Sequence, residues 1–428
     1  MTASLFMLIV FVISMLIRIP ITISMGIGGL AGLLYMGNIP LMTMIQQMGA
    51  GFYSFEFLAI PFFILTAEIM NQGEITDKIF GFSQDVIGWI HGGLAQVTVV
   101  ASAIFAGIQG SMAADCAGLG KVIFAAMTQK GYRKPFTVGI ILAAATLGPM
   151  IPPSIMGVLY AVTAGTSVGK QLLAGLVPGI IIAFSLMVYV YMVVKSKREF
   201  CPMTPRPTFS QLRKSFRSVF PALMTPVILL LGIVSGIVSP TEAGVLACVY
   251  CLIIGFLSKG LKIKHLPSIL TRTIFSSCLI MFIIGISMIM GWIVTREQIP
   301  VKLMQWLMGI TQDKTMILLL INCFLLVLGC LIETAPALLL SVPVLLPVIQ
   351  AVNIDPLQFG EIIIFNLLIG MITPPVGLGL YIMCSITDVS FENVVKGSLP
   401  FYLPLLFALG LITYVPQLST FLPNLFMP

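Results

Sequence analysis

Residues 148–155 read GPMIPPSI, and residues 370–377 read GMITPPVG. Each stretch places a glycine four residues before a double proline, inside a segment rich in Leu, Ile, Val and Ala. Two consecutive prolines break a helix, because each lacks a backbone N–H group and its ring clashes with the preceding turn. The sequence therefore predicts broken helices at 135–165 and 360–386, with their breaks 222 residues apart.

The composition predicts an all-α polytopic membrane protein. The chain is 58% hydrophobic and only 9% charged, with a mean hydropathy of +1.10, whereas a soluble domain carries about 25% charged residues. Apolar runs such as 219–238 are long enough to span a bilayer as helices. We expect one integral membrane domain over 1–428 with a retained first helix, and spans or hairpins near 4–35, 53–71, 92–130, 135–165, 172–194, 219–238, 241–258, 273–295, 314–350, 360–386 and 396–416. The longer runs must be two helices or a hairpin.

The positive charges predict a topology. Half of the 22 Lys and Arg residues flank the spans 219–238 and 241–258, within a scaffold region at 195–272. By the positive-inside rule, both flanking loops are cytoplasmic. The basic residues are Lys195, Lys197, Arg198, Arg206, Arg213, Lys214 and Arg217 in the first loop, and Lys259, Lys262, Lys264 and Arg272 in the second. They do not form the interleaved basic and aromatic face that nucleic-acid binding needs.

Conventional enzyme chemistry has little support in this sequence. Cys248 and Cys251 form one CxxC pair inside an apolar run, which favours buried packing thiols over a metal or redox site. His91 and His265 lie near predicted span ends. No catalytic triad, zinc motif or phosphate-binding loop is present, so we do not expect an enzyme.

The two opening stretches belong to a longer internal repeat. A single shift of 222 residues aligns Gly148 with Gly370, Pro152 with Pro374, Pro153 with Pro375, Gly157 with Gly379, Gly175 with Gly397 and Pro178 with Pro400. The sequence ETAP at 333–336 suits the tip of a hairpin within 314–350, and the same shift leads to a glycine-rich stretch within 92–130. Each repeat, at 92–178 and 314–400, is therefore predicted to hold a re-entrant hairpin followed by a broken helix.

The repeats are predicted to be inverted. Lys130, Arg133 and Lys134 place the start of the first broken helix inside, whereas the loop before the second carries Asp355 and Glu361 and no basic residue. Non-helical backbone at membrane depth must be buried in protein or line a cavity. Inverted repeats with interrupted helices are typical of secondary transporters.

The breaks and tips are candidate sodium sites, because helix breaks free carbonyl oxygens, which hard cations prefer. The expected sodium residues, for two or more ions, are Gly107, Gln109, Gly110, Ser111 and Gly148 in the first repeat, and Gly329, Thr334, Gly370 and Thr373 in the second. The N-termini of half-helices favour an anionic group, and the candidate substrate residues are Ser111, Asp115, Ser154, Glu333 and Thr373. The alternative is that Gly and Pro only kink these helices for packing.

Two other acids have structural explanations. Glu242 follows Pro240 at the start of a span and suits a helix cap. Glu68 lies near a span end, where a structural and a functional role are equally supported.

Five stretches resemble the large membrane subunit of the tripartite ATP-independent periplasmic (TRAP) transporters: LAIPFFILTAEIMNQG (58–73), GSMAADCAGLG (110–120), LGPMIPPSI (147–155), SPTEAGVLA (239–247) and GMITPPVGL (370–378). The resemblance implies a sodium-driven importer of organic acids in the bacterial inner membrane. It implies a small four-helix membrane subunit and a periplasmic substrate-binding protein as partners. It also implies an elevator design, in which the hairpins and broken helices move together, with sodium sites at the tips and breaks.

This chain departs from the family pattern at three points. Gln109-Gly110-Ser111 stands where the family often has Ser-Gly-Ser, and Ala143, Ala144, Ala145 and Thr146 precede the first break where serines are frequent. Glu333 and Thr334 at the second tip resemble dicarboxylate carriers more than sialic-acid carriers, which tend to have Asp. This favours a C4-dicarboxylate or a similar small acid.

Two other functions fit parts of the sequence. One is a sodium–carboxylate symporter that takes its substrate directly from solution, without a binding protein. The other is an ion-conducting subunit of a membrane redox complex, which would need chains of intramembrane Lys, His or Asp that this sequence lacks.

Overall fold

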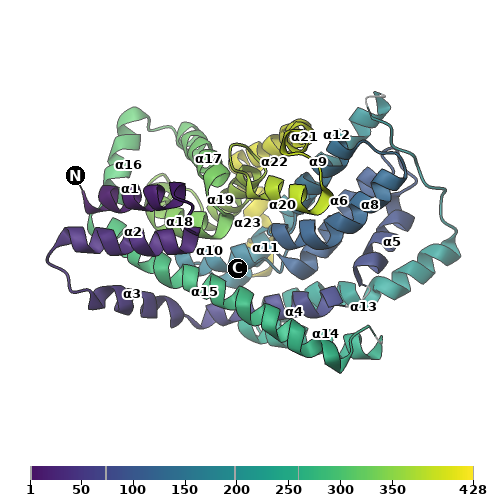
Figure 1. Ribbon diagram of the computed structural model, residues 1–428, viewed down its shortest axis with the longest axis horizontal. Coiled ribbons are helices and arrows are strands. Elements are labelled where there is room, and N and C mark those ends of the chain that lie inside the picture. Colours follow the sequence, from purple (N-terminus) through teal and green to yellow (C-terminus); the bar gives the residue numbers. More distant parts are fainter. Residues whose placement is uncertain (1, 73–74, 197–198, 259, 428) are drawn as a thin grey trace.

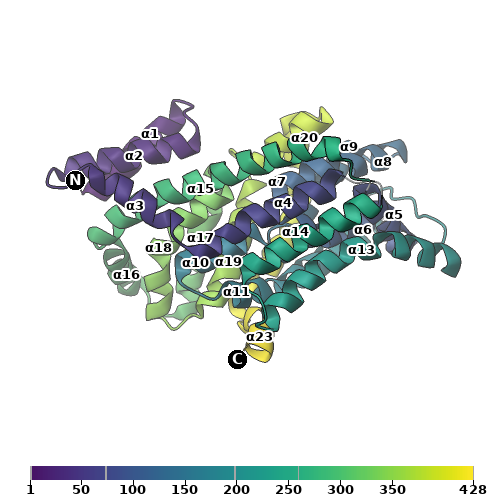
Figure 2. The same cartoon turned by 90° about the horizontal axis from the view of Figure 1, so that it is seen from below.

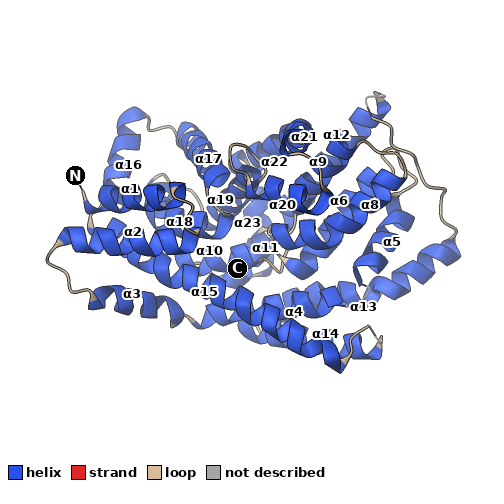
Figure 3. Cartoon of the chain, in the orientation of Figure 1, coloured by secondary structure: helices blue, strands red, loops and turns tan. Residues whose placement is uncertain are grey.

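The computed structural model describes residues 2–72, 75–196, 199–258 and 260–427, and within these ranges it consists of helices without any strand (Figures 1 and 3). The first half contains α1 (Ala3–Leu16), α2 (Ile21–Met36), α3 (Met42–Phe52), η1 (Phe55–Leu58), α4 (Ala59–Gln72), α5 (Ile75–Ile87), α6 (Leu94–Gln109), α7 (Met112–Asp115), the π-helical turn η2 (Cys116–Gly120), α8 (Lys121–Gln129), α9 (Lys134–Ala145), α10 (Ile155–Ala164), α11 (Val168–Ala174) and α12 (Leu176–Lys195).

The second half contains α13 (Phe209–Val234), α14 (Pro240–Leu257), η3 (Ile263–His265), α15 (Leu266–Arg296), α16 (Ile299–Ile310), α17 (Lys314–Leu331), α18 (Thr334–Ala351), α19 (Pro356–Met371), α20 (Leu378–Thr387), α21 (Phe391–Ser398), η4 (Leu399–Phe401), α22 (Tyr402–Tyr414) and α23 (Gln417–Phe426).

The helices confirm a multi-pass membrane protein. Among the described residues, seven helical segments are long and apolar enough to cross a membrane, and the bent pair formed by α3 and η1–α4 gives an eighth. The long predicted runs 4–35, 92–130 and 314–350 each resolve into two arms, as their lengths required. The α1–α2 pair lies at one end of the molecule, and α15 runs along α3 and α4 (Figure 2).

The helix boundaries confirm the internal duplication. At the shift of 222, the end of α6 at Gln109 matches the end of α17 at Leu331, and the start of α7 at Met112 matches the start of α18 at Thr334. The start of α9 likewise matches the start of α19. The same shift relates α2 to α14 and α5 to α16, outside 92–178 and 314–400.

Contacts between the halves show a two-fold relation. A Cβ atom on Gly139 would lie against the Gly397 backbone, and a Cβ atom on Gly175 would lie 3.2 Å from Oε2 of Glu361. These are the same pair of positions with the repeats exchanged, because 139 corresponds to 361 and 175 to 397. A two-fold axis exchanges contacts in this way, whereas a simple translation does not.

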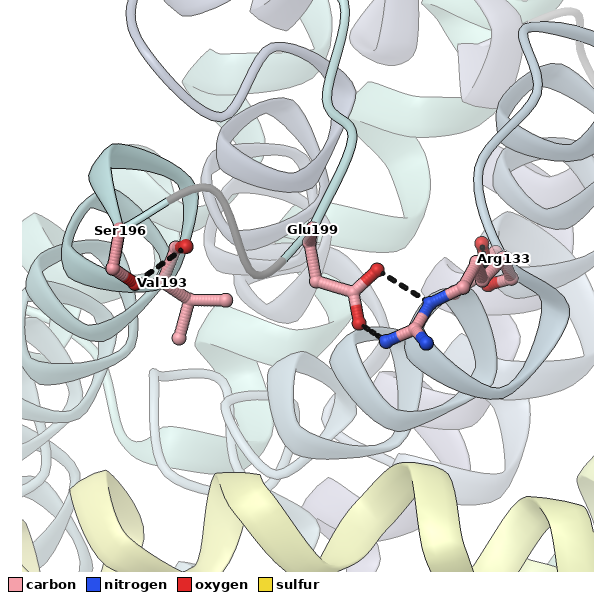
Figure 4. Close-up of polar contacts among 5 residues, drawn as sticks. Arg133, Val193, Ser196 and Glu199 are labelled. Carbon is pink, nitrogen blue, oxygen red and sulfur yellow. Dashed lines mark hydrogen bonds and ion pairs between the residues drawn. The ribbon is translucent and has the colours of Figure 1, made fainter.

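The basic loops contact each other. The Arg133 side chain pairs with the Glu199 carboxylate, with Nε donating to Oε2 at 2.8 Å and Nη2 to Oε1 (Figure 4). The Tyr132 hydroxyl donates to the Pro202 carbonyl at 3.2 Å, and the Thr204 amide donates to the Gly88 carbonyl at 3.0 Å. The loop at 130–134 therefore lies on the same face as the loop that follows α12, as the charge pattern requires.

The predicted loops were too long. Glu361, assigned to the loop before the second broken helix, lies inside α19 and is only 2% exposed. The helix begins earlier because Asp355 caps it and Pro356 occupies its first position. Arg272 likewise lies within α15, where it pairs with Glu68 of α4 at 3.8 Å. Lys197, Arg198 and Lys259 fall outside the described residues.

Candidate functional site

The first break lies between α9 and α10 and is capped by a hydroxyl. The carbonyls of Gly148 and Pro149 have prolines four residues ahead, so their usual helical donors are missing. Ser154 accepts from the Gly157 amide at 2.9 Å and donates to the Pro149 carbonyl. The Ser154 hydroxyl, predicted to bind substrate, is therefore already engaged in ending the break and starting α10.

The second break lies between α19 and α20. Pro374 and Pro375 remove the donors for the Gly370 and Met371 carbonyls, and the Gly370 carbonyl instead accepts from the Thr373 amide at 2.8 Å. The Thr373 hydroxyl donates to the Ile369 carbonyl at 2.7 Å. This hydroxyl retains lone pairs, so it can still be a cation ligand.

The first hairpin tip packs directly on the first break. Gly110 adopts φ +59°, a left-handed conformation that favours glycine, and a Cβ atom there would lie 2.5 Å from the Pro153 carbonyl oxygen. A Cβ atom on Gly148 would lie 3.3 Å from the Ser111 carbonyl, and one on Gly107 would lie 3.6 Å from the Pro152 carbonyl oxygen. The structure thus brings the glycines and serine of the first predicted sodium site together.

Gln109, the other member of this first set, ends α6. Its side chain is 4% exposed, and its Oε1 atom has no hydrogen-bond partner within the described ranges. An unsatisfied buried carbonyl oxygen is costly without a ligand, so this oxygen is available to one.

The second tip packs on the second break just as closely. A Cβ atom on Gly370 would lie 2.5 Å from both Cα and the carbonyl carbon of Gly329. The Gly377 amide donates to the Cys330 carbonyl at 3.1 Å, and the buried Thr334 hydroxyl contacts Sδ of Met371 at 2.7 Å. Gly329, Thr334 and Gly370 therefore meet at one point, with Thr373 in the turn that follows.

Each hairpin also reaches the other repeat. Helix α10 packs on α18 of the second hairpin, and α20 packs on α7, η2 and α8 of the first. A Cβ atom on Gly379 of α20 would lie 2.8 Å from the Met112 side chain. The second half of each broken helix thus links its own break to the opposite hairpin, and the two half-sites interlock.

The two acids at the tips have different surroundings. Asp115 is 3% exposed and faces the Ser102 hydroxyl of α6, yet neither of its oxygens has a hydrogen-bond partner at bonding distance within the described ranges. Glu333 is exposed at the N-terminus of α18 and makes no capping hydrogen bond. No group of three His, Cys, Asp or Glu residues among those described could hold a metal ion.

Several buried polar contacts were not predicted. Asn366 donates to the carbonyl and side-chain oxygens of Asn322 at 3.1 and 2.7 Å, and Asn322 donates to the Thr413 hydroxyl at 3.1 Å. Gln171 donates to Glu361 at 2.5 Å. Polar side chains inside apolar runs were the only signal in the sequence, and their partners lie far along the chain.

The structure also reports on the minor predictions. Glu242 forms a capping box with Ser239 at the start of α14, accepting from its amide at 2.7 Å, which confirms the capping role. Cys248 and Cys251 are buried free thiols that contact Thr66 and Thr225, which confirms the packing interpretation.

Comparisons with known proteins agree with this architecture. The family model described as the DctM component of the tripartite ATP-independent periplasmic transporter matches residues 8–418. The sialic acid TRAP transporter large permease SiaM of Vibrio cholerae is 38% identical over 410 residues, covering 95% of each chain. The C4-dicarboxylate TRAP transporter large permease DctM of Pseudomonas aeruginosa is 36% identical and covers 86% of each chain.

Two further comparisons concern length and fold. The sialic acid TRAP transporter permease SiaT of Haemophilus influenzae is 38% identical over 88% of this chain, which spans only 61% of that longer protein. The crystal structure of the YdaH transporter of Alcanivorax borkumensis superimposes with a TM-score of 0.62 and 16% identity, covering 89% of this chain and 88% of that one. The likeness to YdaH concerns the fold alone.

Proposed function

The chain belongs to the family of DctM components, the large permeases of tripartite ATP-independent periplasmic transporters, and on that premise we propose that it is a sodium-driven importer of organic acids. It is a multi-pass membrane protein, and we place it in the bacterial inner membrane. Membership of this permease family leaves the redox-complex alternative without support.

The observation that carries the proposal is the direct contact of each hairpin tip with its own break. Gly110 meets Pro153, and Gly329 meets Gly370, at distances that leave no room for a side chain. Beside these contacts lie backbone carbonyls whose helical amide donors are replaced by prolines, and carbonyl and hydroxyl oxygens are the ligands that hard cations accept. We assign one sodium ion to Gly107, Gln109, Gly110, Ser111 and Gly148, and a second to Gly329, Thr334, Gly370 and Thr373.

The substrate is proposed to be a carboxylate held between the two tips. Helices α7, α10, α18 and α20 begin at the tips and breaks, and their N-terminal dipoles favour an anion. Ser111, Asp115, Ser154, Glu333 and Thr373 are the candidate contacts. The relatives are named for sialic acid and C4-dicarboxylates, and Glu333 with Thr334 at the second tip favours a C4-dicarboxylate here.

We propose two protein partners, a small four-helix membrane subunit and a periplasmic substrate-binding protein. The extra length of the Haemophilus influenzae permease is consistent with a fused small subunit, which this chain would obtain as a separate protein. In the proposed cycle, the hairpins and broken helices move as one body against the scaffold around α13–α15.

Uptake by the purified complex in proteoliposomes tests this proposal. Candidate binding proteins and a panel of labelled acids are added in turn, with a sodium gradient directed inward. We expect one or a few carboxylates to accumulate only with their binding protein. Equal uptake without any binding protein would favour the independent symporter instead.

A further inference from the structure

Tyr402, which begins α22, reaches the second break from outside the two hairpins. Its hydroxyl donates to the Ile372 carbonyl at 2.5 Å and lies near the Thr373 hydroxyl. Ser398, at the end of α21, lies with its hydroxyl oxygen 3.2 Å from the Tyr402 hydroxyl. Ser398, Tyr402 and Thr373 thus form a hydroxyl cluster at the break between α19 and α20.

The cluster supplies donors that the broken helix has lost. In a continuous helix, the Ile369 and Ile372 carbonyls would accept from amides four residues ahead. The chain turns away at the double proline, and the Thr373 hydroxyl donates to Ile369 while the Tyr402 hydroxyl donates to Ile372. The Ile369 carbonyl also accepts from the Ile372 amide at 3.2 Å, whereas the donor that the described residues give the Ile372 carbonyl is the Tyr402 hydroxyl. The direction of the Ile372 carbonyl is therefore set by this tyrosine.

The first break has no such cluster. At the shift of 222, Tyr402 corresponds to Ile180, Ser398 to Leu176 and Thr373 to Ile151, and Ile180 is 63% exposed. The first break instead uses Ser154, which donates to the Pro149 carbonyl; its counterpart in the second repeat is Val376. The two breaks have the same double-proline backbone pattern, but different hydroxyl groups donate hydrogen bonds to their carbonyls.

We infer that Tyr402 is a positioning residue of the second cation site, where it orients the Ile372 carbonyl, next to the Thr373 hydroxyl, toward bound sodium. This inference rests on the sodium-driven function proposed above. The Ser398 hydroxyl can give its one proton either to the Tyr402 oxygen, 3.2 Å away, or to the Val395 carbonyl at 2.9 Å, so it is a weaker, secondary support for the tyrosine. The first site, which lacks the cluster, does not depend on this tyrosine.

The test replaces Tyr402 by Phe, which removes one oxygen and keeps the ring. The control is Tyr381→Phe on α20, an exposed tyrosine whose ring stacks on Phe391. Sodium-dependent uptake is titrated at matched protein amount, and thermal unfolding is measured alongside. Loss of one hydrogen bond, ~0.5–1.5 kcal/mol, corresponds to a roughly 2- to 12-fold rise in the sodium concentration for half-maximal uptake.

We expect Tyr402→Phe to raise the sodium midpoint with little change in unfolding temperature, Ser398→Ala to raise it less, and Tyr381→Phe to leave it unchanged. A wild-type midpoint in Tyr402→Phe, with or without a lower unfolding temperature, would overturn the inference while the proposed function stands. An equal shift in Tyr381→Phe would also overturn it. Wild-type uptake that does not depend on sodium would contradict both the proposed function and this inference.

Discussion

Among glycine-to-alanine substitutions at the contact between the second hairpin and its break, Gly370→Ala produces the closest steric overlap. The new Cβ atom would lie 2.5 Å from Cα and the carbonyl carbon of Gly329 and 2.9 Å from the Cys330 amide nitrogen. Ordinary contact starts near 3.4 Å, so α17 must retreat by about 1 Å, and all three opposing atoms are backbone. The hairpin arm cannot yield by a rotamer change.

The magnitude follows from two opposing effects. Alanine in place of glycine favours a helix by ~1 kcal/mol, whereas overpacking a closely fitted contact costs about 1–3 kcal/mol. We therefore expect a net loss of up to ~2 kcal/mol in the free energy of unfolding. If the retreat of α17 removes one oxygen from sodium, at about 1.5–3 kcal/mol for a bond to a charged group, the sodium midpoint rises roughly 10- to 150-fold.

The assay combines thermal unfolding with sodium-titrated uptake at matched protein amount. Gly410→Ala in α22 is the matched control, because nothing lies within 4 Å of its Cβ position, and we expect an unchanged midpoint and equal or higher stability. Gly329→Ala should resemble Gly370→Ala, and Gly148→Ala should have a milder effect, since its nearest neighbours would be 3.3 Å away. Wild-type stability and sodium midpoint in Gly370→Ala would refute the packing argument.

Three further predictions follow from the same structure. Thr373→Ala should raise the sodium midpoint roughly 5- to 150-fold, for ~1–3 kcal/mol, with expression nearly unchanged and Thr373→Ser close to wild type; an unchanged midpoint in the alanine variant would remove this hydroxyl from the site. Single cysteines at Met203 and Lys262, in a protein without its native cysteines, should react with an impermeant maleimide only after permeabilisation, and one at Ala351 should react in whole cells; the reverse pattern would contradict the inverted topology. Burial raises the pKa of Glu297, but the nearby Ser4 hydroxyl, the amides of Ser4 and Ala3, which donate to it at 2.8 and 2.6 Å, and Lys302 together hold that pKa below its usual value. The contribution of Glu297 to stability is thus present above about pH 4.3 and is lost as pH falls through the lower folded pKa. Glu297→Gln should therefore flatten the pH dependence of the unfolding temperature between about pH 5 and pH 3. An unchanged pH profile would show that this contact does not stabilise α1.

The breaks and tips could be located from the sequence because they depend on local physics. Double prolines end helices wherever they occur. A repeated pattern of Gly and Pro can be recognised within a single sequence, without aligned homologues. The ETAP sequence located one hairpin tip at Glu333, and the shift of 222 led from it to the other tip at Ser111, where the structure has them. The loop before the second broken helix was predicted too long, because Asp355 caps α19 and Pro356 takes its first position, so that Glu361 lies inside the helix.

The pairings within the site could not be predicted because they join distant residues. Asn322 and Asn366 lie 44 residues apart, and Tyr402 lies 30 residues from Ile372. Gly329 and Gly370 were predicted as ion ligands, which stays a prediction, and the structure shows a packing role for both, since neither position has room for a side chain. Which glycine of the break contacts which residue of the hairpin depends on the angle between the hairpin and the broken helix, and only the folded chain defines that angle.

Uptake driven by defined ion gradients tests the central claim most directly. The purified permease, with its small subunit and binding protein, is reconstituted in proteoliposomes, and labelled carboxylate is followed with an inward sodium gradient or with a proton gradient in sodium-free buffer. We predict accumulation with sodium and none with protons alone, because oxygen-rich breaks, rather than a chain of proton-carrying side chains, form the proposed site. Full uptake in sodium-free buffer with only a proton gradient would contradict the account.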